Sequence, residues 1–357
     1  MNELIIKSGD GEYPVHFFDS LEAVLHQLES IQNTYFIVDR KVYHLYPQLV
    51  QYLTNKTFLL LDATEEEKSW EGTGKVLKWY QENNITKANH IVAIGGGIIQ
   101  DITCFSASVY YRGLSWSFVP TTVLSMSDSC IGAKCAVNFN GYKNQVGTFH
   151  SPKSVYICSE FATTLEQKDI LSGYGEILKL AITGNKDLYL KLVQDLASED
   201  LRGKILNDLI KATLAVKKSI IEIDEYETNL RRILNYGHTL GHSLESLSDY
   251  AVPHGLAVAW GMDIINFISW KRGHLSETHF REIHGLIKKY FSFSLEKMIS
   301  AEALLNGARR DKKASGNAVN LILLSDFGKL EIVKINFDQD LTNQVETYLK
   351  EYNLYAN

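Results

Sequence analysis

Short strand-like runs alternate with helical segments through the first 150 residues of the chain. Two runs of apolar and β-branched residues, TYFIVD and TFLLLD, occupy residues 34–39 and 57–62, and two more, HIVAIGGG and WSFVPTT, occupy 90–97 and 116–122. An amphipathic pattern at 66–83 predicts a helix between the second and third runs. Strands that alternate with helices pair in parallel, because each helix carries the chain back across a face of the sheet. The sequence therefore predicts a mostly parallel sheet covered by helices.

The hydrophobic pattern changes beyond about residue 160. Apolar residues now recur at helical spacing over long stretches, at 162–195, 198–224, 229–247, 254–272 and 276–290. A β-hairpin is predicted at 318–335, followed by a last helix at 338–352. We place the domain boundary near residue 155 and expect an α/β domain at 1–155 and a mainly α-helical domain at 156–357.

The charge of the chain limits the partners it can have. The 357 residues include 36 lysines and arginines and 42 aspartates and glutamates, which gives a net charge of −6. A nucleic-acid surface needs clustered basic residues, and the sequence has no long basic stretch. We therefore expect a small-molecule ligand and no nucleic acid, and any anionic ligand must be held by a few cations placed locally.

Nothing in the sequence predicts export or a membrane segment. The N-terminus has no basic region leading into an apolar stretch. The most apolar later segment, AVAWGMDIINFISW, carries Asp263 and Asn266, and so falls short of the roughly 18 uninterrupted apolar residues of a membrane span. Irregular cysteine spacing favours buried, reduced thiols over a zinc cluster or a disulfide framework, at Cys104, Cys130, Cys135 and Cys158. A cytoplasmic protein is expected.

The glycine run at the end of HIVAIGGG leads from a strand into a helix. Gly95, Gly96 and Gly97 stand where backbone N–H groups can approach a pyrophosphate. The dinucleotide fingerprint G-x-G-x-x-G is imperfect here because its last position is Gln100. Nucleotide binding and a merely tight turn both remain open. Asp39, at the end of an earlier strand, can accept a hydrogen bond from a ribose or cap the helix that follows.

Three histidines have metal-binding spacing. His238 and His242 lie four residues apart on one helical face, and His254 begins the next helix. Thr239 stands where a zinc peptidase of the H-E-x-x-H type has its glutamate, which disfavours peptidase chemistry. An anionic ligand is still needed, and Glu176 is a candidate, although its spacing to Lys179 is by itself more typical of a solvated ion pair.

Polar residues gather in a glycine-bearing segment at 125–152, which we interpret as a binding loop on a rigid scaffold. It holds Asp128, Lys134, Lys143 and Asn144. The helical half adds Lys217, Arg231 and Asn235. The run RRDKK at 309–313, viewed alone, is typical of a solvated charge cluster.

Together these segments resemble the 3-dehydroquinate synthase family, within the sugar phosphate cyclase superfamily. The matching stretches are TEEEKS (64–69), GGGIIQD (95–101), YYRG (110–113), PTT (120–122), SDSCIGAK (127–134), YKNQVGTF (142–149), SGYGEILK (172–179), the segment 217–242 ending in NYGHTLGH, PHGLAVAWGM (253–262) and RDKK (310–313). They span nearly the whole chain, in the order and at the spacings of the family.

The resemblance implies an N-terminal NAD-binding, Rossmann-like α/β domain and a helical C-terminal domain that binds metal and substrate. It implies that Zn²⁺, or Co²⁺, is bound by Glu176, His238 and His254. The positions that hold NAD in the family are Asp39, Glu65, Lys68, Gly96, Gly97, Asp101, Thr121 and Thr122. The positions around the substrate are Asp128, Lys134, Lys143, Asn144, Lys179, Lys217, Arg231, Asn235, His242 and a lysine after Asp311, for which we choose Lys313 over Lys312.

The activity implied is the conversion of 3-deoxy-D-arabino-heptulosonate 7-phosphate to 3-dehydroquinate and phosphate, a step of the shikimate pathway. The family mechanism is a transient oxidation by NAD, phosphate elimination, re-reduction and an internal aldol closure. Arg112 matches an arginine that reaches the neighbouring subunit's site, which implies a homodimer.

Two departures from the family pattern leave other substrates open. Gln100 replaces a usual glycine, and Ala133 replaces another beside the unusual pair Ser129-Cys130. A sister cyclase acting on sedoheptulose 7-phosphate or glucose 6-phosphate is the first alternative. A metal-dependent glycerol or alcohol dehydrogenase is a more remote one, and a non-catalytic binding or scaffold relative is the third.

Overall fold

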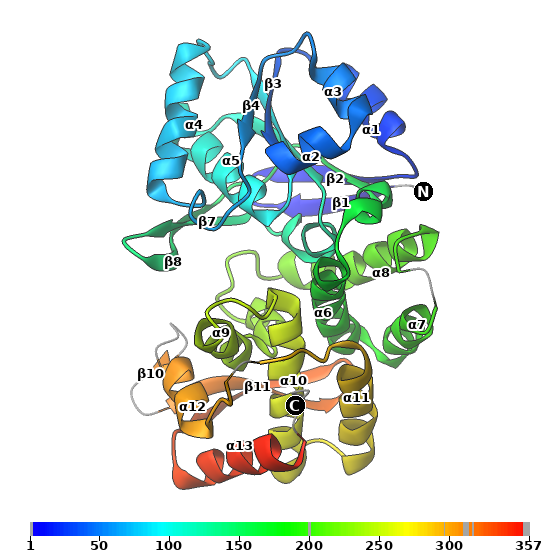
Figure 1. Ribbon diagram of the computed structural model, residues 1–357, viewed down its shortest axis with the longest axis vertical. Helices are drawn as coiled ribbons and strands as arrows, with labels where there is room; N and C mark the ends of the chain where they lie inside the picture. The colour runs from blue at the N-terminus through cyan, green and yellow to red at the C-terminus, as the bar shows by residue number, and fades with distance from the viewer. Residues whose placement is uncertain (1–2, 199–200, 296, 310–313, 316–317, 353–357) are drawn as a thin grey trace. The chain divides into compact units, whose positions relative to one another are not determined.

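The computed structural model describes residues 3–198, 201–295, 297–309, 314–315 and 318–352. The chain divides into two compact units, which are described separately (Figure 1). Unit 1 comprises Met1–Glu166 and Arg202–Tyr226, and unit 2 comprises Gln167–Leu201 and Glu227–Asn357. The stretch that returns to unit 1 carries helix α8 (Lys204–Ile221). The single domain boundary near residue 155 stays a prediction.

Unit 1 is built on a seven-stranded sheet with the order β1-β2-β9-β6-β5-β3-β4. Its strands are β1 (Glu3–Ser8), β2 (Gly11–Phe18), β3 (Thr34–Asp39), β4 (Phe58–Leu61), β5 (His90–Gly95), β6 (Ser115–Pro120) and β9 (Val155–Cys158). Only the edge strand β1 pairs antiparallel; all other neighbours in this sheet pair in parallel. The predicted parallel sheet is confirmed.

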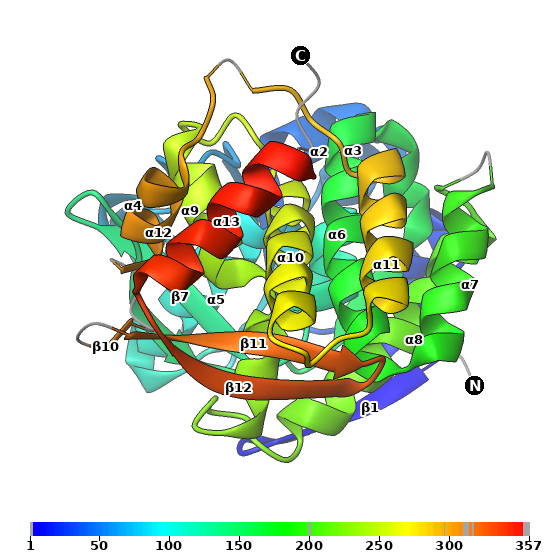
Figure 2. The same cartoon turned by 90° about the horizontal axis from the view of Figure 1, so that it is seen from below.

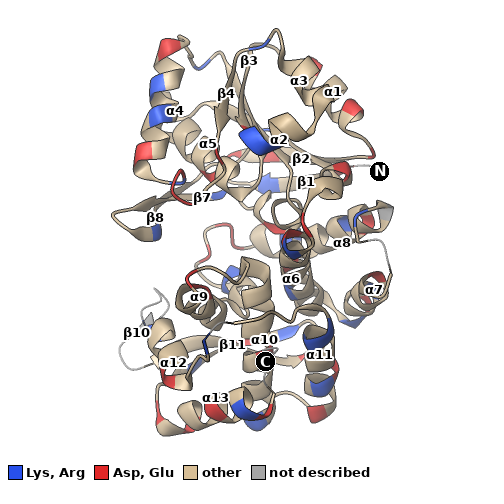
Figure 3. Cartoon of the chain, viewed as in Figure 1, with Lys and Arg blue, Asp and Glu red and all other residues tan. Residues whose placement is uncertain are grey.

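Helices flank the sheet, and β2, β3, β4 and β5 each lead into one of them. They are α1 (Leu21–Glu29), α2 (Arg40–Leu45), α3 (Pro47–Leu53), α4 (Trp70–Glu82) and α5 (Gly97–Val109), with the 3₁₀ turns η1 (Tyr110–Arg112) and η3 (Ser159–Thr164). The helix α5 is apolar on most sides, and α4 packs against it. The surface helix α4 carries both acidic and basic side chains (Figure 3).

The segment 125–152 is more regular than the binding loop expected from the sequence. It forms a π-helical turn η2 (Ser125–Ser129) and an antiparallel hairpin of β7 (Lys134–Phe139) and β8 (Tyr142–Phe149). The dipeptide Asn140-Gly141 makes the hairpin turn, and both residues have positive φ, 50° and 80°. This is the pair that two-residue hairpin turns favour, so the sequence did carry the signal.

Unit 2 is mainly helical, as predicted. Its helices are α6 (Gln167–Gly184), α7 (Lys186–Leu196), α9 (His238–Leu247), α10 (His254–Lys271), α11 (Glu277–Tyr290), α12 (Ala301–Arg309) and α13 (Gln339–Glu351), with the 3₁₀ turn η4 (Leu230–Asn235). The short strand β10 (Ala314–Ser315) pairs with the hairpin of β11 (Ala318–Asp326) and β12 (Lys329–Asn336). Asn185 caps α7 and separates it from α6, where the sequence predicted one continuous helix.

Helix α10 is the centre of unit 2. Every residue from Gly255 to Ser269 is buried, because α6, α9, α11, α13 and β11 all contact this helix (Figure 2). A helix that is apolar all round can only be stable when it is covered on every side.

Among the described residues, no helix is long and apolar enough to cross a membrane. The four cysteines are buried free thiols, as predicted.

Glycines allow α10 to approach its neighbours at backbone distance. A Cβ added to Gly175 of α6 would overlap the carbonyl of Gly255, and one added to Gly255 would overlap the carbonyl of Ser172. The Gly255 N–H donates to Ser172 Oγ at 3.0 Å across the same crossing. On the α9 side, a Cβ on Gly261 would overlap the carbonyl of Gly237. These contacts set the positions of the residues next to the glycines.

Replacing Gly255 by alanine should therefore strongly destabilise the protein. The added methyl group cannot be accommodated by a flexible side chain, because backbone atoms surround it, and overpacking of this kind costs on the order of 3 kcal/mol. Urea unfolding of the variant measures the loss. Gly285→Ala on α11 is the matched control, since no described atom lies within 4 Å of its added Cβ, and it should be neutral or stabilising. Equal midpoints for the two variants would contradict the close-packed crossing.

Candidate active site

Three residues from three helices of unit 2 converge on one point. Glu176 lies in α6, and His238 and His254 are the first residues of α9 and α10. The Glu176 Oε1 atom is 3.4 Å from His238 Nε2 and 3.1 Å from His254 Nε2. Each of these residues adjoins one of the glycines at the helix crossings, namely Gly175, Gly237 or Gly255. The crossings therefore place the carboxylate and the two imidazoles together.

The cluster has the chemistry of a metal site. Its ligand atoms all lie within 4.8 Å of one another. Glu176 is 1% exposed, and both its carboxylate oxygens lack a hydrogen bond of regular geometry among the described residues. A buried carboxylate needs a cation or hydrogen-bond donors, and one carboxylate with two imidazoles is a common ligand set for Zn²⁺. The residues present fit a divalent metal ion.

The two histidines differ in pKa because their partners differ. Burial lowers the pKa of His238 to about 4, so its ring is neutral and can coordinate a metal at neutral pH. Burial also lowers the pKa of His254, but its close contacts with the carboxylates of Glu176 and Glu245 outweigh this and raise it to about 10. Without a metal ion, the carboxylates on either side of His254 thus stabilise a positive charge on its ring.

Glu245 is a site residue that the sequence reasoning missed. Its Oε2 atom is 3.1 Å from His254 Nδ1, so it holds the ring on the side opposite Glu176. A carboxylate in this place orients a ligand histidine and makes it a stronger ligand. The signal was available, because Glu245 lies seven residues after His238 on the same helix and therefore on the same face.

Lys179 and His242 border the cluster. Lys179 is 2% exposed and pairs with Glu176, so the interpretation of this pair as a solvated ion pair is wrong. Burial raises the pKa of Glu176, but Lys179 and His238 together hold it well below its usual value. The exposed ring of His242 lies 5.4 Å from the ring of His238 and 5.8 Å from that of His254.

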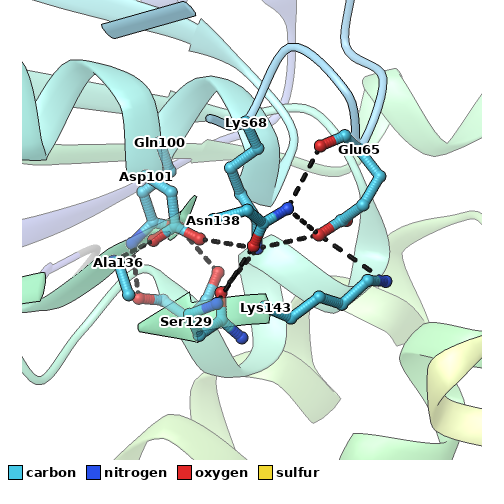
Figure 4. A network of polar contacts seen from close by, with 9 residues as sticks. Glu65, Lys68, Gln100, Asp101, Ser129, Ala136, Asn138 and Lys143 are labelled. Carbon is cyan, nitrogen blue, oxygen red and sulfur yellow. Dashed lines mark hydrogen bonds and ion pairs between the residues drawn. The ribbon is translucent and has the colours of Figure 1, made fainter. Parts of the chain in front are cut away.

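Unit 1 brings several of the expected cofactor and substrate residues into one polar network (Figure 4). Lys68 Nζ lies 3.3 Å from Asp101 Oδ2 and 3.7 Å from Glu65 Oε1, and it donates to Asn144 Oδ1 at 2.9 Å. Lys143 Nζ is 3.5 Å from the same Glu65 oxygen. Residues assigned to the cofactor, on the segment before α4 and on α5, thus contact residues assigned to the substrate, on the hairpin β7–β8.

The network controls the ionisation of its carboxyl groups. Burial raises the pKa of Asp101 to about 6, although Lys68 and the backbone N–H of Ala136 lower it. Burial also raises the pKa of Glu65, but Lys68 and Asn138 outweigh this and lower it overall. Asn138 Nδ2 donates to Glu65 Oε1 at 2.8 Å.

The glycine turn has the geometry of an anion-binding helix start. Gly96 is the N-cap of α5 and has no side chain to bond the first N–H groups of the helix. A Cβ on Gly96 would lie 3.0 Å from Thr122 Cγ2, so the turn packs against Thr122. Thr121 is buried, and its N–H donates to the Gly95 carbonyl at 2.9 Å.

Asp39 caps α2 by accepting from the Lys41 N–H at 2.8 Å, which is one of its two expected roles.

Asp128 and Lys217 form a second pair in unit 1. Lys217 Nζ, on α8, donates to the Asp128 carbonyl at 2.6 Å and to its carboxylate. Lys217 is buried and Asp128 is half-buried.

Lys134, at the start of β7, is exposed. Its neighbour Ala133 has φ 61°, a left-handed conformation that favours the glycine usual in the family.

Three further expected residues are described, and the others lie outside the described part. Arg231 is buried in unit 2, and Asn235 donates to Glu227. Arg112 is exposed and has φ 61°. Lys312 and Lys313 lie outside the described residues, as does most of RRDKK.

Comparison with known proteins gives a consistent result over most of the chain. The 3-dehydroquinate synthase N-terminal family matches residues 58–172, and the 3-dehydroquinate synthase C-terminal family matches 173–314. A 3-dehydroquinate synthase of Thermoanaerobacter sp. strain X514 is 32% identical over 352 residues, which cover 96% of this chain and 99% of the relative.

Two solved structures share the fold. A 2-deoxy-scyllo-inosose synthase complexed with carbaglucose-6-phosphate, NAD⁺ and Co²⁺ superposes with a TM-score of 0.86 at 22% identity, over 96% of this chain and 99% of that one. A 2-epi-5-epi-valiolone synthase of Streptomyces hygroscopicus subsp. jinggangensis, with NAD⁺ and Zn²⁺ bound, gives 0.82 at 24% identity, over 95% and 96%. The predicted fold class is confirmed.

Because of Asp101, the stability of unit 1 should depend on pH. Its pKa is about 6 in the folded protein and near 3.8 in the unfolded chain, so the folded state binds the extra proton between these values. The stability that Asp101 contributes therefore falls as the pH rises from 4 to 6. Relative to Asp101→Asn, the wild-type free energy of unfolding should drop by about 2 kcal/mol between pH 4.5 and pH 7. Urea unfolding of both proteins at the two pH values measures it, and a difference independent of pH would contradict the raised pKa.

His254→Ala should abolish metal retention. The variant loses one of three ligands, and we expect zinc affinity to fall by more than about 100-fold. Metal content after gel filtration and competition with a chromogenic chelator give the readout. His242→Ala is the comparison, since His242 is exposed and should leave zinc retention in place. Unchanged metal content in His254→Ala would refute the ligand assignment.

Proposed function

Since the chain belongs to the 3-dehydroquinate synthase family, we propose that it converts 3-deoxy-D-arabino-heptulosonate 7-phosphate to 3-dehydroquinate and inorganic phosphate. The observation that carries this proposal is the cluster of buried Glu176 with half-buried His238 and His254, beside Lys179, which fits a metal ion. The reaction releases phosphate and involves no net oxidation, because the substrate is oxidised and then reduced again.

The proposed cofactor positions follow the family assignment. The metal ion, Zn²⁺ or Co²⁺, is held by Glu176, His238 and His254. NAD is held by Asp39, Glu65, Lys68, Gly96, Gly97, Asp101, Thr121 and Thr122. When bound, NAD⁺ provides the reversible oxidation of a substrate hydroxyl and the metal polarises that oxygen. Support comes from the open N-terminus of α5 and from the pKa of His238, which keeps its ring neutral.

The chain's own residues bind and orient an acidic substrate. Arg231 suits a carboxylate because its guanidinium can donate two parallel hydrogen bonds, and lysine ammonium groups suit the phosphate. Asp128 holds the ammonium of Lys217 in place. The exposed ring of His242, beside the cluster, can exchange a proton at a ring nitrogen with the substrate. Further proposed contacts are Lys134, Lys143, Asn144, Lys179, Asn235 and Lys313.

We further propose a cytoplasmic homodimer in which Arg112 reaches the partner's site. Arg112 is exposed, and the neighbouring Tyr111 is 54% exposed, so the turn is available for contact. A place in the shikimate pathway follows from the proposed substrate.

A sister cyclase activity is the second candidate. Ala133 and the pair Ser129-Cys130 depart from the family pattern next to Asp128 and Lys134, so this part of the site can accept a different sugar phosphate. Retention of Arg231 and Lys217, which suit a carboxylate, favours the heptulosonate. A metal-dependent alcohol or glycerol dehydrogenase would carry out net oxidation and would not need so many anion-binding residues.

Phosphate release tests these alternatives directly. The purified protein with a catalytic amount of NAD⁺ and Zn²⁺ is given the heptulosonate 7-phosphate, sedoheptulose 7-phosphate or glucose 6-phosphate, and phosphate and NADH are measured. We expect phosphate release from the heptulosonate without accumulation of NADH, and loss of activity with a chelator. Phosphate release from only one of the other two sugar phosphates would identify that sugar phosphate as the substrate. The protein would then still be assigned to the cyclases. Stoichiometric NADH without phosphate would favour a dehydrogenase.

A further inference from the structure

Gln100 and Ser129 hold each other by two reciprocal hydrogen bonds. Gln100 Nε2 donates to the Ser129 carbonyl at 2.6 Å, and Ser129 Oγ donates to Gln100 Oε1 at 2.6 Å (Figure 4). Gln100 is 5% exposed. Its amide thus uses both of its polar ends on one residue, and the two departures from the family pattern at 100 and 129 are in direct contact.

Each partner lies beside residues assigned to the site. Gln100 is in the first turn of α5, between Gly97 and Asp101. Ser129 ends the π-helical turn η2 and directly follows Asp128, whose carbonyl and carboxylate both bind Lys217. The pair therefore connects the start of α5, within unit 1, to the turn that positions the Asp128–Lys217 ion pair.

The turn η2 depends on side chains for its shape. It has only five residues, and π-helical geometry is rare and frequently found at functional sites. At its beginning, Thr122 Oγ1 and Ser125 Oγ are hydrogen-bonded at 2.8 Å. At its end, Gln100 bonds both the backbone and the side chain of Ser129. A glycine at position 100 could make neither bond to Ser129.

We propose that Gln100 is a positioning residue that fixes Asp128, and through it Lys217, for the sugar phosphate. This inference rests on the proposed function for its kinetic consequence, but its structural consequence, an ordered turn at 125–129, is independent of the substrate. Gln100 acts through Ser129 and does not itself need to touch a ligand.

The experiment compares Gln100→Ala, Ser129→Ala and the double variant in the full-length protein. We expect kcat/KM for the sugar phosphate to fall at least about 10-fold in Gln100→Ala, while the Kd of NAD⁺ changes less than about twofold. Ser129→Ala should have a smaller effect, because the carbonyl still accepts from Gln100. The double variant should be no worse than Gln100→Ala, since the two residues act as one unit. Without ligands, amide hydrogen exchange in the turn 125–130 should be faster in Gln100→Ala.

Ser106→Ala separates positioning from mere packing. Ser106 lies on the same helix, is fully buried, and its hydroxyl is 3.1 Å from Tyr80 Oη, so its loss should lower thermal stability without changing kcat/KM or exchange in the turn. Unchanged kcat/KM and unchanged exchange in Gln100→Ala would overturn the inference. If the wild-type protein releases phosphate from none of the three sugar phosphates, the proposed function fails, and exchange at 125–130 alone decides whether Gln100 holds the turn.

Discussion

The burial of one carboxylate, that of Glu176, organises the helical unit. A carboxylate removed from water must be compensated by positive charge or by hydrogen-bond donors, and its burial would otherwise cost several kcal/mol. Lys179 comes from the same helix, and His238 and His254 begin two others. The starts of α9 and α10 are thus held where they can satisfy Glu176. Its requirement for positive charge is also what makes the cluster suitable for a metal ion.

In unit 1, too, carboxylates are compensated by a cation, but here several groups share the same cation. A single ammonium group, that of Lys68, contacts Asp101 on α5 and Asn144 on the hairpin, and lies near Glu65. Residues that the family assigns to different ligands therefore depend on each other for charge compensation. The raised pKa of Asp101 shows that this compensation is incomplete, because burial outweighs the neighbouring cation.

The hydrophobic periodicity of the sequence predicted most of the helices and strands. It could not predict which side chains are buried or which of them pair. The strands around residues 34–39, 58–61 and 90–95 and the long helices were recognised because their patterns are local. The hairpin β7–β8 was missed because β8 is mostly polar and none of its residues is buried, although Asn140-Gly141 indicated its turn. Glu176 and Lys179 looked solvated because spacing along a helix does not tell which face is covered. The candidate metal ligands were proposed from histidine spacing and family resemblance; Glu245, which contacts one of them, was not.

The glycines at the helix crossings have a consequence for genetics. Gly175, Gly237 and Gly255 each adjoin a candidate metal ligand, and a side chain at any of them would meet atoms of a neighbouring helix. A screen for inactive alleles would therefore recover these glycines together with Glu176, His238 and His254, although glycine offers no side-chain ligand. Abundance of the protein in the cell would report the packing defect, since a glycine substitution that clashes with a neighbouring backbone destabilises the chain and sends it to degradation.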